Sequence, residues 1–352
     1  MIKIGIIGTG GMAGSHAQRF QSIRGVKLQA CCDISAERAE AFAKHYGIPK
    51  VYTDYHAMLD QEKLDGVSNV TPDALHAQVA LAVLEHGVAI LSEKPLASNL
   101  EDARKMADAA KKAGVINMVN FSYRNSSALQ KAAEVVKKGE IGEIKHVEAS
   151  YLQSWLVSTG WGDWRTTPGF TWRLSTKHGS AGTLGDVGCH IYDFATLVCG
   201  DISEIECRLK TFDKGIPGNK IGEYTLDAND SFVSTVAFAN GAIGTVHSTR
   251  WACGQLNSLR LRVFGDKGGL EIDLDTSYDE YRICKGKDIE SATWKTVKCK
   301  HTPNMYERFI RAIRTGVNDP SDFANGAKIQ AYLRYSEESD RKHCGVKVDI
   351  RY

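Results

Sequence analysis

Several features that would assign this chain to a specialised class of protein are absent or scarce. No run of about 18 apolar residues occurs, so no membrane-spanning helix and no membrane partner are expected. The nine cysteines are scattered, with Cys31 and Cys32 adjacent and no Cys-x-x-Cys pair, so neither a disulfide framework nor a zinc site is indicated. We therefore expect a cytoplasmic chain that binds no metal.

A surplus of positive charge is also missing. Lys and Arg total 44 against 42 for Asp and Glu, a formal net charge of +2. Such a balance provides no basic surface for a nucleic-acid backbone, so no nucleic-acid partner is expected. With 43% hydrophobic and 24% charged residues, the composition is that of an ordinary globular protein. The 352 residues exceed one ordinary core, so two domains and a small-molecule partner are predicted.

The first third of the chain alternates short β-branched segments with segments of helical spacing. Strands are expected over 3–7, 27–32, 66–70, 88–92 and 115–119, with helices between them over 12–24, 35–45, 74–86 and 99–113. Ser35 is placed to cap the second helix, and Ser98 and Glu101 form a capping box before the last. This alternation predicts an α/β domain with a doubly wound parallel sheet, a Rossmann domain over residues 1–121.

The rest of the chain shows a different periodicity. After a helix over 123–139, segments alternate polar and apolar residues with period two over 144–153, 230–238, 242–251, 258–264 and 269–273. Asn240 and Gly241 provide a hairpin turn between two of them. Helices over 304–315 and 322–343 and a strand over 346–349 finish the chain. An α+β domain with an antiparallel sheet is predicted over residues 122–352.

A glycine-rich turn joins the first expected strand to the first helix. The run Gly8-x-Gly10-x-x-Ala13 in this setting is typical of a dinucleotide-binding turn, with alanine in place of the third glycine. Glycines there let the backbone approach a pyrophosphate, which helix N-terminal amides bind. Glycine-rich turns are also ordinary connectors, so the motif alone leaves both interpretations open.

Asp33 favours the dinucleotide interpretation. It ends the second strand 25 residues after Gly8, near the spacing of about 20 expected for a carboxylate that accepts hydrogen bonds from the adenosine ribose. Such a carboxylate would repel a 2′-phosphate, so NAD is preferred over NADP. The alternative role for Asp33 is that of a cap or turn residue. Because Arg38 lies nearby in the sequence, NADP is not excluded as the cofactor.

Three further segments resemble one enzyme family. They are 67–72 (VSNVTP) with the adjoining Leu75 and His76, 92–97 (SEKPLA) and 185–193 (GDVGCHIYD). Together with the glycine turn, they resemble the glucose-fructose oxidoreductase, inositol dehydrogenase and rhizopine-catabolism family. The resemblance implies a Rossmann domain, then a substrate and oligomerisation domain with a large open, mostly antiparallel sheet. It also implies a homodimer or homotetramer formed through that sheet.

The resemblance also implies functional residues. The catalytic lysine, aspartate and histidine of the family correspond to Lys94, Asp186 and His190. The cofactor is expected at Gly8, Gly10, Gly11, Met12, Asp33, Ile34, Thr71, Pro72, His76, Glu93 and Lys94. The substrate is expected at Lys94, Tyr123, Trp164, Arg173, Asp186 and His190.

Elementary chemistry supports the catalytic roles. Asp186 and His190 are four residues apart and project from one face of a helix that opens near Thr183. An imidazole suits removal of a hydroxyl proton while a hydride leaves, so His190 is the expected base. Lys94 would stabilise the developing alkoxide, and Asp186 would orient the substrate or the imidazole. A lone lysine or Asp–His pair is also common on protein surfaces, so only the joint pattern favours catalysis. Asp193 is interpreted as structural.

A tryptophan cluster and two departures from the family pattern bear on the substrate. Stacking on a sugar ring and packing within a loop or subunit contact are both open for Trp155, Trp161, Trp164 and Trp172. Weaker candidates for substrate contact are Arg165, Arg173, His178 and Trp251. The run 180–182 replaces a common glycine run, and 123–127 lacks a proline often found there, so the exact substrate is not predicted.

The sequence therefore predicts an NAD-dependent dehydrogenase that oxidises a secondary hydroxyl of a sugar, inositol or related polyol. One alternative is an NADPH-dependent keto-sugar reductase, against which Asp33 argues. The other is a nucleotide-binding regulator without turnover, against which the presence of all three catalytic residues argues.

Overall fold

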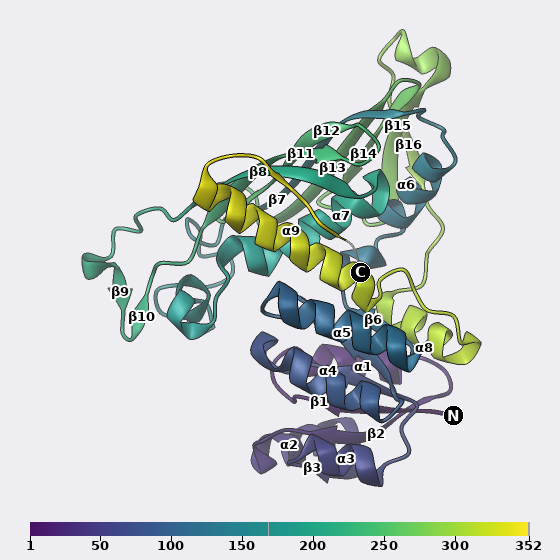
Figure 1. The fold of residues 1–352 in the computed structure, drawn as a ribbon, viewed down its shortest axis with the longest axis vertical. Helices are drawn as coiled ribbons and strands as arrows, with labels where there is room; N and C mark the ends of the chain where they lie inside the picture. Colours follow the sequence, from purple (N-terminus) through teal and green to yellow (C-terminus); the bar gives the residue numbers. More distant parts are fainter. Residues whose placement is uncertain (168, 351–352) are drawn as a thin grey trace. The chain divides into compact units, whose positions relative to one another are not determined.

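The computed structural model describes residues 1–167 and 169–350, which form two compact units. Unit 1 comprises Met1–Ser122 and Pro303–Gln330. Unit 2 comprises Tyr123–Thr302 and Ala331–Ile350. Helix α9 (Phe323–Lys342) begins in unit 1 and ends in unit 2 (Figure 1).

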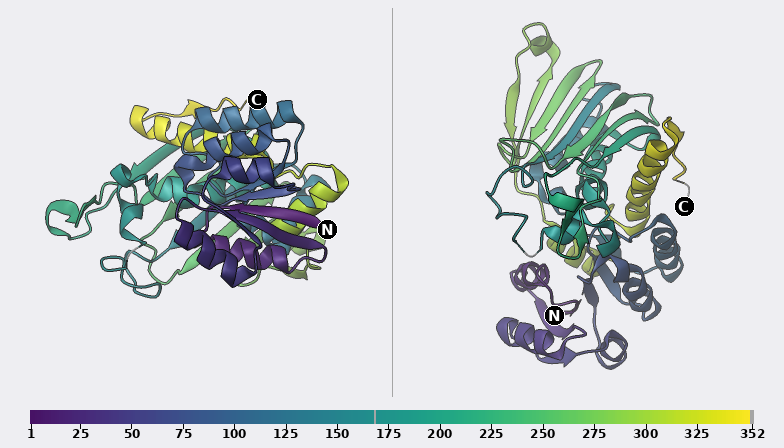
Figure 2. Two further views of the ribbon diagram at one scale, coloured as in Figure 1. Left: turned by 90° about the horizontal axis from the view of Figure 1, so that it is seen from below. Right: turned by 90° about the vertical axis from the view of Figure 1, so that its left-hand side faces the viewer.

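Unit 1 is built on a six-stranded parallel sheet with the order β3-β2-β1-β4-β5-β6. Its strands are β1 (Ile2–Ile7), β2 (Val26–Cys32), β3 (Lys50–Tyr52), β4 (Gly66–Asn69), β5 (Ala89–Ser92) and β6 (Asn117–Val119). Its helices are α1 (Ala13–Gln21), α2 (Ala36–Tyr46), α3 (Tyr55–Gln61), η1 (Asp73–Leu75), α4 (His76–Glu85), α5 (Leu100–Ala113) and α8 (Met305–Thr315). Helices cover both faces of the sheet (Figure 2). The predicted doubly wound Rossmann domain is confirmed.

Helix α8 belongs to unit 1 although it lies near the end of the chain. Its apolar stripe, which includes Tyr306 and Phe309, joins the same core as Phe20 of α1. The Tyr306 ring meets Phe20 edge-on, with 5.2 Å between centroids. The predicted division into 1–121 and 122–352 places this segment in the second domain and is wrong there. The reason is that α8 buries its apolar stripe against unit 1, which its sequence alone does not reveal.

Two predicted caps have different outcomes. Ser35 caps α2 as expected, because its hydroxyl accepts a hydrogen bond from the Arg38 amide at 3.3 Å. The predicted capping box of Ser98 and Glu101 is wrong. The N-cap of α5 is Asn99, whose side chain accepts a hydrogen bond from the Asp102 amide at 2.9 Å. An asparagine is as good a cap as a serine, so the sequence offered two neighbouring choices.

Unit 2 is built on a nine-stranded sheet with the order β16-β15-β14-β13-β7-β12-β11-β8-β17. Its strands are β7 (Ile144–Gln153), β8 (Ile202–Lys210), β11 (Ser231–Phe238), β12 (Ile243–Thr249), β13 (Asn257–Gly265), β14 (Gly268–Asp273), β15 (Glu280–Lys285), β16 (Lys295–Lys298) and β17 (Val346–Lys347). Only β7 and β12 pair in parallel among these described strands. The predicted large, mostly antiparallel sheet is confirmed.

Helices and short segments complete unit 2. They are η2 (Ser122–Asn125), α6 (Ser127–Lys137), η3 (Thr171–Leu174), η4 (Thr176–His178), the π-helix η5 (Leu184–Gly188), α7 (Cys189–Cys199), η6 (Pro217–Asn219), η7 (Gly286–Ile289) and the hairpin β9 (Lys220–Ile221) with β10 (Tyr224–Thr225). Helices lie on one face of the large sheet and leave the other open (Figure 2). Because one face is covered and the other is open, buried and exposed side chains alternate along the strands. In β11, Phe232 and Val236 are buried, whereas Val233 is exposed. Within the described residues, no helix is both long and apolar enough to cross a membrane.

Candidate functional site

The turn after β1 has the geometry that a bound pyrophosphate requires. Gly8 has φ of +89°, and a Cβ there would lie 2.5 Å from the Val70 carbonyl oxygen, so only glycine fits. At Gly10 and Gly11, a Cβ would meet no described atom within 4 Å. This open space lies directly before α1, whose N-terminal end suits an anion. The residues present therefore fit a dinucleotide.

Asp33 lies at the end of β2, beside this turn. Its Oδ2 accepts hydrogen bonds from the amide and hydroxyl of Thr9, both at 2.9 Å. Its Oδ1 accepts from the Ser35 amide at 3.0 Å and from Arg38 Nη2 at 2.7 Å. Burial by itself raises the pKa of Asp33, but Arg38, Ser35 and Thr9 outweigh it and lower the pKa to about 2. Asp33 is thus a fixed, ionised carboxylate with Arg38 as its exposed partner.

The residues expected around the rest of the cofactor lie on neighbouring loops of unit 1. Met12 follows the glycine turn, and Ile34 follows β2; both side chains are exposed. Thr71 and Pro72 follow β4, and the Thr71 hydroxyl donates to Asn69 Oδ1 at 2.7 Å. These residues all stand at the carboxyl ends of the parallel strands, where open α/β sheets bind ligands.

Glu93 belongs to a buried network rather than to an open surface. Its Oε1 lies 2.9 Å from His16 Nε2 and accepts a hydrogen bond from Asn120 Nδ2 at 2.6 Å. Its Oε2 accepts from the Lys94 amide at 3.2 Å. Burial raises the pKa of Glu93, but the His16 hydrogen bond and charge, Asn120 and Lys94 lower it to about 2. Glu93 is thus an ionised anchor beside Lys94, and nothing in its contacts points to the cofactor.

His76 was expected at the cofactor, and the structure places it inside unit 1 instead. Its ring is fully buried. Nδ1 lies 2.8 Å from the Pro95 carbonyl oxygen, and Nε2 lies 2.9 Å from the Thr71 carbonyl oxygen. Both ring nitrogens face protein atoms, so His76 connects the loops that carry Pro95 and Thr71. The sequence could not show these contacts, because they depend on which strands lie side by side in the folded sheet.

Asp186 and His190 lie in unit 2 on consecutive turns of different helix types. Asp186 is in the π-helix η5, and His190 is in the first turn of α7. The expected ordinary helix opening near Thr183 is therefore replaced by a π turn, a geometry found often at functional sites. The His190 ring meets the Tyr123 ring edge-on, with 4.9 Å between centroids. The predicted substrate residue Tyr123 thus adjoins the predicted base.

Two arginines face Asp186, and one of them was not predicted. Arg250 Nη2 donates to Asp186 Oδ2 at 3.0 Å, and Arg173 Nε lies 3.8 Å from the same oxygen. The Arg250 side chain is fully buried and stacks over Trp155 at 4.7 Å from the ring centroid. Burial lowers the pKa of Arg250 although Asp186 and Asp230 oppose the shift, and arginine keeps its charge. The neighbouring Trp251 was a candidate from the sequence, but Arg250 lies 64 residues from Asp186 and gave no local signal.

A closed ring of hydrogen bonds adjoins His190. The Tyr123 and Tyr151 hydroxyls lie 2.5 Å apart, the Tyr151 hydroxyl donates to Asn257 Oδ1 at 2.7 Å, and Asn257 Nδ2 donates to the Tyr123 hydroxyl at 2.8 Å. Burial and then Tyr123 raise the pKa of Tyr151 well above its ordinary value, so it remains a donor. Tyr151 and Asn257 were not predicted, because they lie on strands with no distinguishing motif.

Trp164 was expected to contact substrate and is instead part of an apolar cluster. It is 2% exposed, packs with Trp155 and Leu174, and donates its indole N–H to the Leu156 carbonyl oxygen at 3.2 Å. The ring of Trp164 and its indole N–H thus both have partners within unit 2. Of the other clustered tryptophans, Trp161 and Trp172 are exposed. Packing explains the buried pair, and only the exposed pair retains the stacking interpretation.

Asp193 has the structural role that was expected. Its carboxylate makes a two-point ion pair with Arg124, at 2.8 Å to Nε and 2.6 Å to Nη2, and both side chains are buried. The pair joins η2 to α7 within unit 2. It holds Tyr123, the neighbour of Arg124, next to His190.

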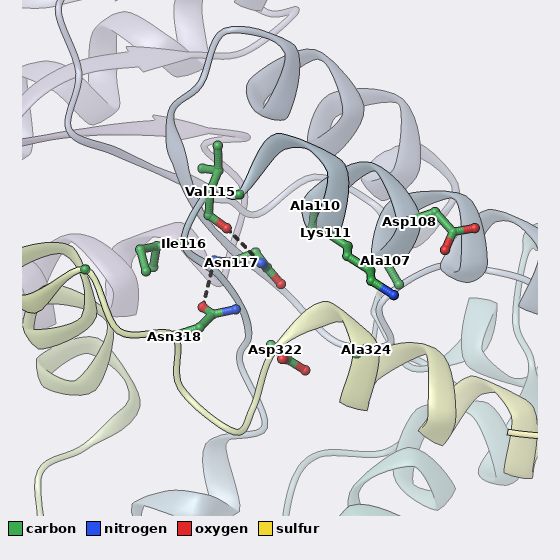
Figure 3. Close-up of a pocket in the computed structure, with 12 residues that line it drawn as sticks. Ala107, Asp108, Ala110, Lys111, Val115, Ile116, Asn117, Asn318, Asp322 and Ala324 are labelled. Atoms are coloured by element: carbon green, nitrogen blue, oxygen red, sulfur yellow. Dashed lines mark hydrogen bonds between the residues drawn. The ribbon is translucent and has the colours of Figure 1, made fainter. Parts of the chain in front are cut away.

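A separate cleft of about 460 Å³ lies in unit 1 between α5, the start of β6 and the segment before α9 (Figure 3). Asn117 donates its amide to Asn318 Oδ1 at 3.1 Å across it. The lining residues include Asp108, Lys111 and Asp322 and none of the predicted site residues. Because it adjoins the amino end of a parallel strand, it is not where an α/β sheet binds its cofactor. Among residues 1–167 and 169–350, no group of three or more His, Cys, Asp or Glu side chains has metal-binding geometry.

Family models match both parts of the chain. Residues 2–121 match the oxidoreductase family with an NAD-binding Rossmann fold. Residues 129–271 match the GFO/IDH/MocA C-terminal domain. The two matches follow the order of the two predicted domains.

Relatives and solved structures agree with the family models. The chain is 28% identical over 312 residues to the levoglucosan dehydrogenase of Pseudarthrobacter phenanthrenivorans, covering 82% of this chain and 77% of that one. It is 32% identical over 249 residues to the D-glucoside 3-dehydrogenase of Escherichia coli, covering 69% of this chain and 68% of that one. The structure of levoglucosan dehydrogenase in complex with NADH and levoglucosan is similar with a TM-score of 0.88, 26% identity and coverage of 99% and 100%. As its motifs predicted, the chain belongs to the GFO/IDH/MocA family of NAD(P)-dependent oxidoreductases, dehydrogenases that act on CH–OH groups.

Proposed function

We propose that the protein is a cytoplasmic dehydrogenase that oxidises a secondary hydroxyl of a sugar, inositol or related polyol with NAD. The observation that carries this proposal is the arrangement around His190. The His190 ring contacts Tyr123, which belongs to a ring of hydrogen-bonded hydroxyl and amide groups. One helical turn before His190, the buried Arg250 binds the carboxylate of Asp186. Such a set binds a polyol by hydrogen bonds and removes a hydroxyl proton. Two relatives, levoglucosan dehydrogenase and D-glucoside 3-dehydrogenase, are named for sugar substrates, which supports a sugar substrate here.

Unit 1 residues would bind NAD, which accepts the hydride when it is bound. Gly8, Gly10 and Gly11 would leave room for the pyrophosphate at the start of α1. Asp33 would accept hydrogen bonds from the adenosine ribose. All its acceptor sites are used by Thr9, Ser35 and Arg38, so the exposed Arg38 would have to leave. Met12, Ile34, Thr71 and Pro72 would line the remaining length of the cofactor.

Three charged or titratable side chains would perform the chemistry. His190 would take the hydroxyl proton as the C–H electron pair leaves with the hydride. Lys94 would stabilise the negative charge that develops on the oxygen. Asp186, fixed by Arg250, would accept a hydrogen bond from a neighbouring hydroxyl and so orient the ring. Tyr123 and Arg173 would complete the polyol contacts.

The two parts of the chain would divide these tasks. Unit 1 would bind the dinucleotide, and unit 2 would supply most substrate contacts. The open face of the nine-stranded sheet would join copies of the chain into a homodimer or homotetramer. Exposed apolar side chains on that face, Val233 and Ile243, support the assembly.

Absorbance of NADH tests the proposal directly. The protein is mixed with NAD and a panel of sugars and inositols, and NADH is expected to form with at least one of them. Lys94→Ala is expected to lower kcat by about 10²-fold or more, because it removes an electrostatic contribution made in the transition state. Undiminished turnover of Lys94→Ala would contradict the proposed role. Tight NAD binding without turnover across the panel would favour a regulator instead.

A further inference from the structure

Lys94 is flanked by two residues that buried histidines hold in place. On its N-terminal side, His16 of α1 contacts the carboxylate of Glu93. On its C-terminal side, His76 of α4 contacts the carbonyl oxygen of Pro95. Both imidazole rings are fully buried within unit 1. Residues of α1 and α4 therefore contact the same three-residue segment, one on each side of Lys94.

We propose that His16 and His76 are positioning residues that fix Lys94 for hydride transfer. The inference rests on the proposed function, in which Lys94 stabilises the alkoxide. Neither histidine would touch the reacting atoms, since the nitrogens of both rings are directed at protein groups. Their effect on catalysis would pass entirely through the backbone of the segment that carries Lys94.

The contact on the Glu93 side runs from ring to main chain. His16 Nε2 lies 2.9 Å from Glu93 Oε1, and Glu93 Oε2 accepts a hydrogen bond from the Lys94 amide at 3.2 Å. His16 Nδ1 lies 2.8 Å from the hydroxyl of Ser68 in β4, which sets the orientation of the ring. The low pKa of Glu93 keeps its carboxylate ionised at neutral pH. The link is therefore a charge-assisted one.

The contact on the Pro95 side joins two loops. His76 Nδ1 lies 2.8 Å from the Pro95 carbonyl oxygen, and Nε2 lies 2.9 Å from the Thr71 carbonyl oxygen. Thr71 follows β4 and Pro95 follows β5, so the ring connects the carboxyl ends of adjacent strands. Asn69 Nδ2 donates to the backbone oxygen of His76 at 3.2 Å and secures the start of α4. Displacing this ring would release the loop after Lys94.

Small displacements of Lys94 are expected to matter. Electrostatic support of an alkoxide requires the ammonium at hydrogen-bond distance, and a misplacement of about 1 Å can cost about 10²-fold in rate. A lysine side chain is long and rotatable, so its head group is placed by its backbone and by its surroundings. Fixing the residues before and after Lys94 limits the movement of its backbone.

Asparagine and glutamine variants separate the two nitrogens of each ring, since an Asn amide replaces Nδ1 and a Gln amide replaces Nε2. His16→Gln keeps the contact to Glu93, whereas His16→Asn keeps only the contact to Ser68. His76→Asn keeps the contact to Pro95, whereas His76→Gln keeps only the contact to Thr71. We expect His16→Gln and His76→Asn to retain kcat within about threefold, and the opposite variants to lose about tenfold or more. The Kd for NAD should change little in the three variants that leave the contact to Thr71 in place, His16→Gln, His16→Asn and His76→Gln.

His86→Asn is a matched control in the same unit. Its Nδ1 lies 2.7 Å from the Ala82 carbonyl oxygen and its Nε2 lies 3.0 Å from Asp60, so it makes similar contacts at the far end of α4. Its kcat should equal that of the wild type. Equal kcat values within each Asn/Gln pair, or losses of kcat that follow losses of Tm, would overturn the inference.

A second measurement does not depend on turnover. The rate at which an amine reagent labels Lys94, measured by mass spectrometry relative to the exposed Lys111, reports the environment of the ammonium. This rate should change in His16→Asn and His76→Gln and stay near the wild-type value in their partners. If the wild type turns over no polyol, the proposed function fails, and the labelling rates alone decide on the positioning. Identical labelling in all four variants would overturn it.

Discussion

Both units hold a carboxylate against an arginine, but the buried member of the pair differs. In unit 1, Asp33 is 8% exposed and Arg38 is 57% exposed. In unit 2, Arg250 is fully buried and Asp186 is 31% exposed. The buried member is fixed by its surroundings, and the exposed member can exchange partners at small cost. Under the proposed function, Arg38 in unit 1 would leave the fixed carboxylate of Asp33 when the cofactor binds. In unit 2, the fixed Arg250 would hold the more exposed carboxylate of Asp186 in place for the substrate.

Removing the buried cation of unit 2 should have the largest effect. Arg250→Met leaves Asp186 without its anchor and is expected to lower kcat/KM by about 10²-fold and stability by about 2 kcal/mol. The loss of stability falls below that of a fully buried pair because Asp186 is partly hydrated. Polyol turnover and Tm test both effects. Arg260→Met is the control, since Arg260 is half-exposed at a surface pair with Asp273. Wild-type activity in Arg250→Met would refute the anchoring role.

Removing the charge of Asp33 in unit 1 should act mainly on binding of the cofactor. Asp33→Asn is expected to raise KM for NAD by about tenfold or more, because hydrogen bonds to a charged acceptor are stronger than those to a neutral one. The kcat at saturating NAD should stay near that of the wild type. Titration of NAD measures the change. A fall in kcat with unchanged KM would place Asp33 outside the cofactor site.

Acid should weaken unit 1 through the buried carboxylate of Glu93. The pKa of Glu93 is about 2 in the folded chain against an ordinary value of 4.5. The stability that this charge contributes is therefore complete above pH 4.5 and is lost as the pH falls towards 2. The difference in unfolding free energy between the wild type and Glu93→Gln should be constant near neutral pH and shrink across that window. Chemical unfolding at a series of pH values measures it, and a difference independent of pH would contradict it.

Removing the exposed cation of unit 1 should have the smallest effect. Arg38→Ala removes an ion pair whose cation is exposed. Tm and KM for NAD should therefore change little, by about twofold at most for KM. The preference for NAD over NADP should increase, because a nearby arginine favours a 2′-phosphate. The ratio of kcat/KM for the two cofactors tests this. Clearly tighter NADPH binding in the wild type would favour a keto-sugar reductase.

The sequence predicted the elements whose signals are local. The glycine turn, the strand that ends at Asp33 and the alternating strands of the second sheet are each visible within about ten residues. The motifs around Lys94 and His190 pointed to the family, which the comparisons confirmed. For two predicted site residues, the structure shows a ring that is buried and bound by protein groups. Trp164 and His76 are ring-bearing residues next to a motif, and their sequence neighbours cannot show which way the rings point.

The partners of the predicted residues could not be found in the sequence. His16 and Glu93 are 77 residues apart, and Asn257 and Tyr123 are 134 residues apart. Each contact forms only when the fold places two distant segments of the chain side by side. The sequence around one residue of such a pair does not indicate its partner. The contact therefore cannot be predicted from short segments of the sequence.

The order of elements, the two sheet types, the dinucleotide turn and the family follow from residue patterns within short segments of the chain. Hydrophobic periodicity and glycine positions act over a few residues and are written directly in the chain. The tertiary structure alone decided that α8 joins unit 1, that Arg250 anchors Asp186 and that two histidines enclose the Lys94 segment. Those contacts follow from which apolar faces are buried together, and that choice is made by the whole chain.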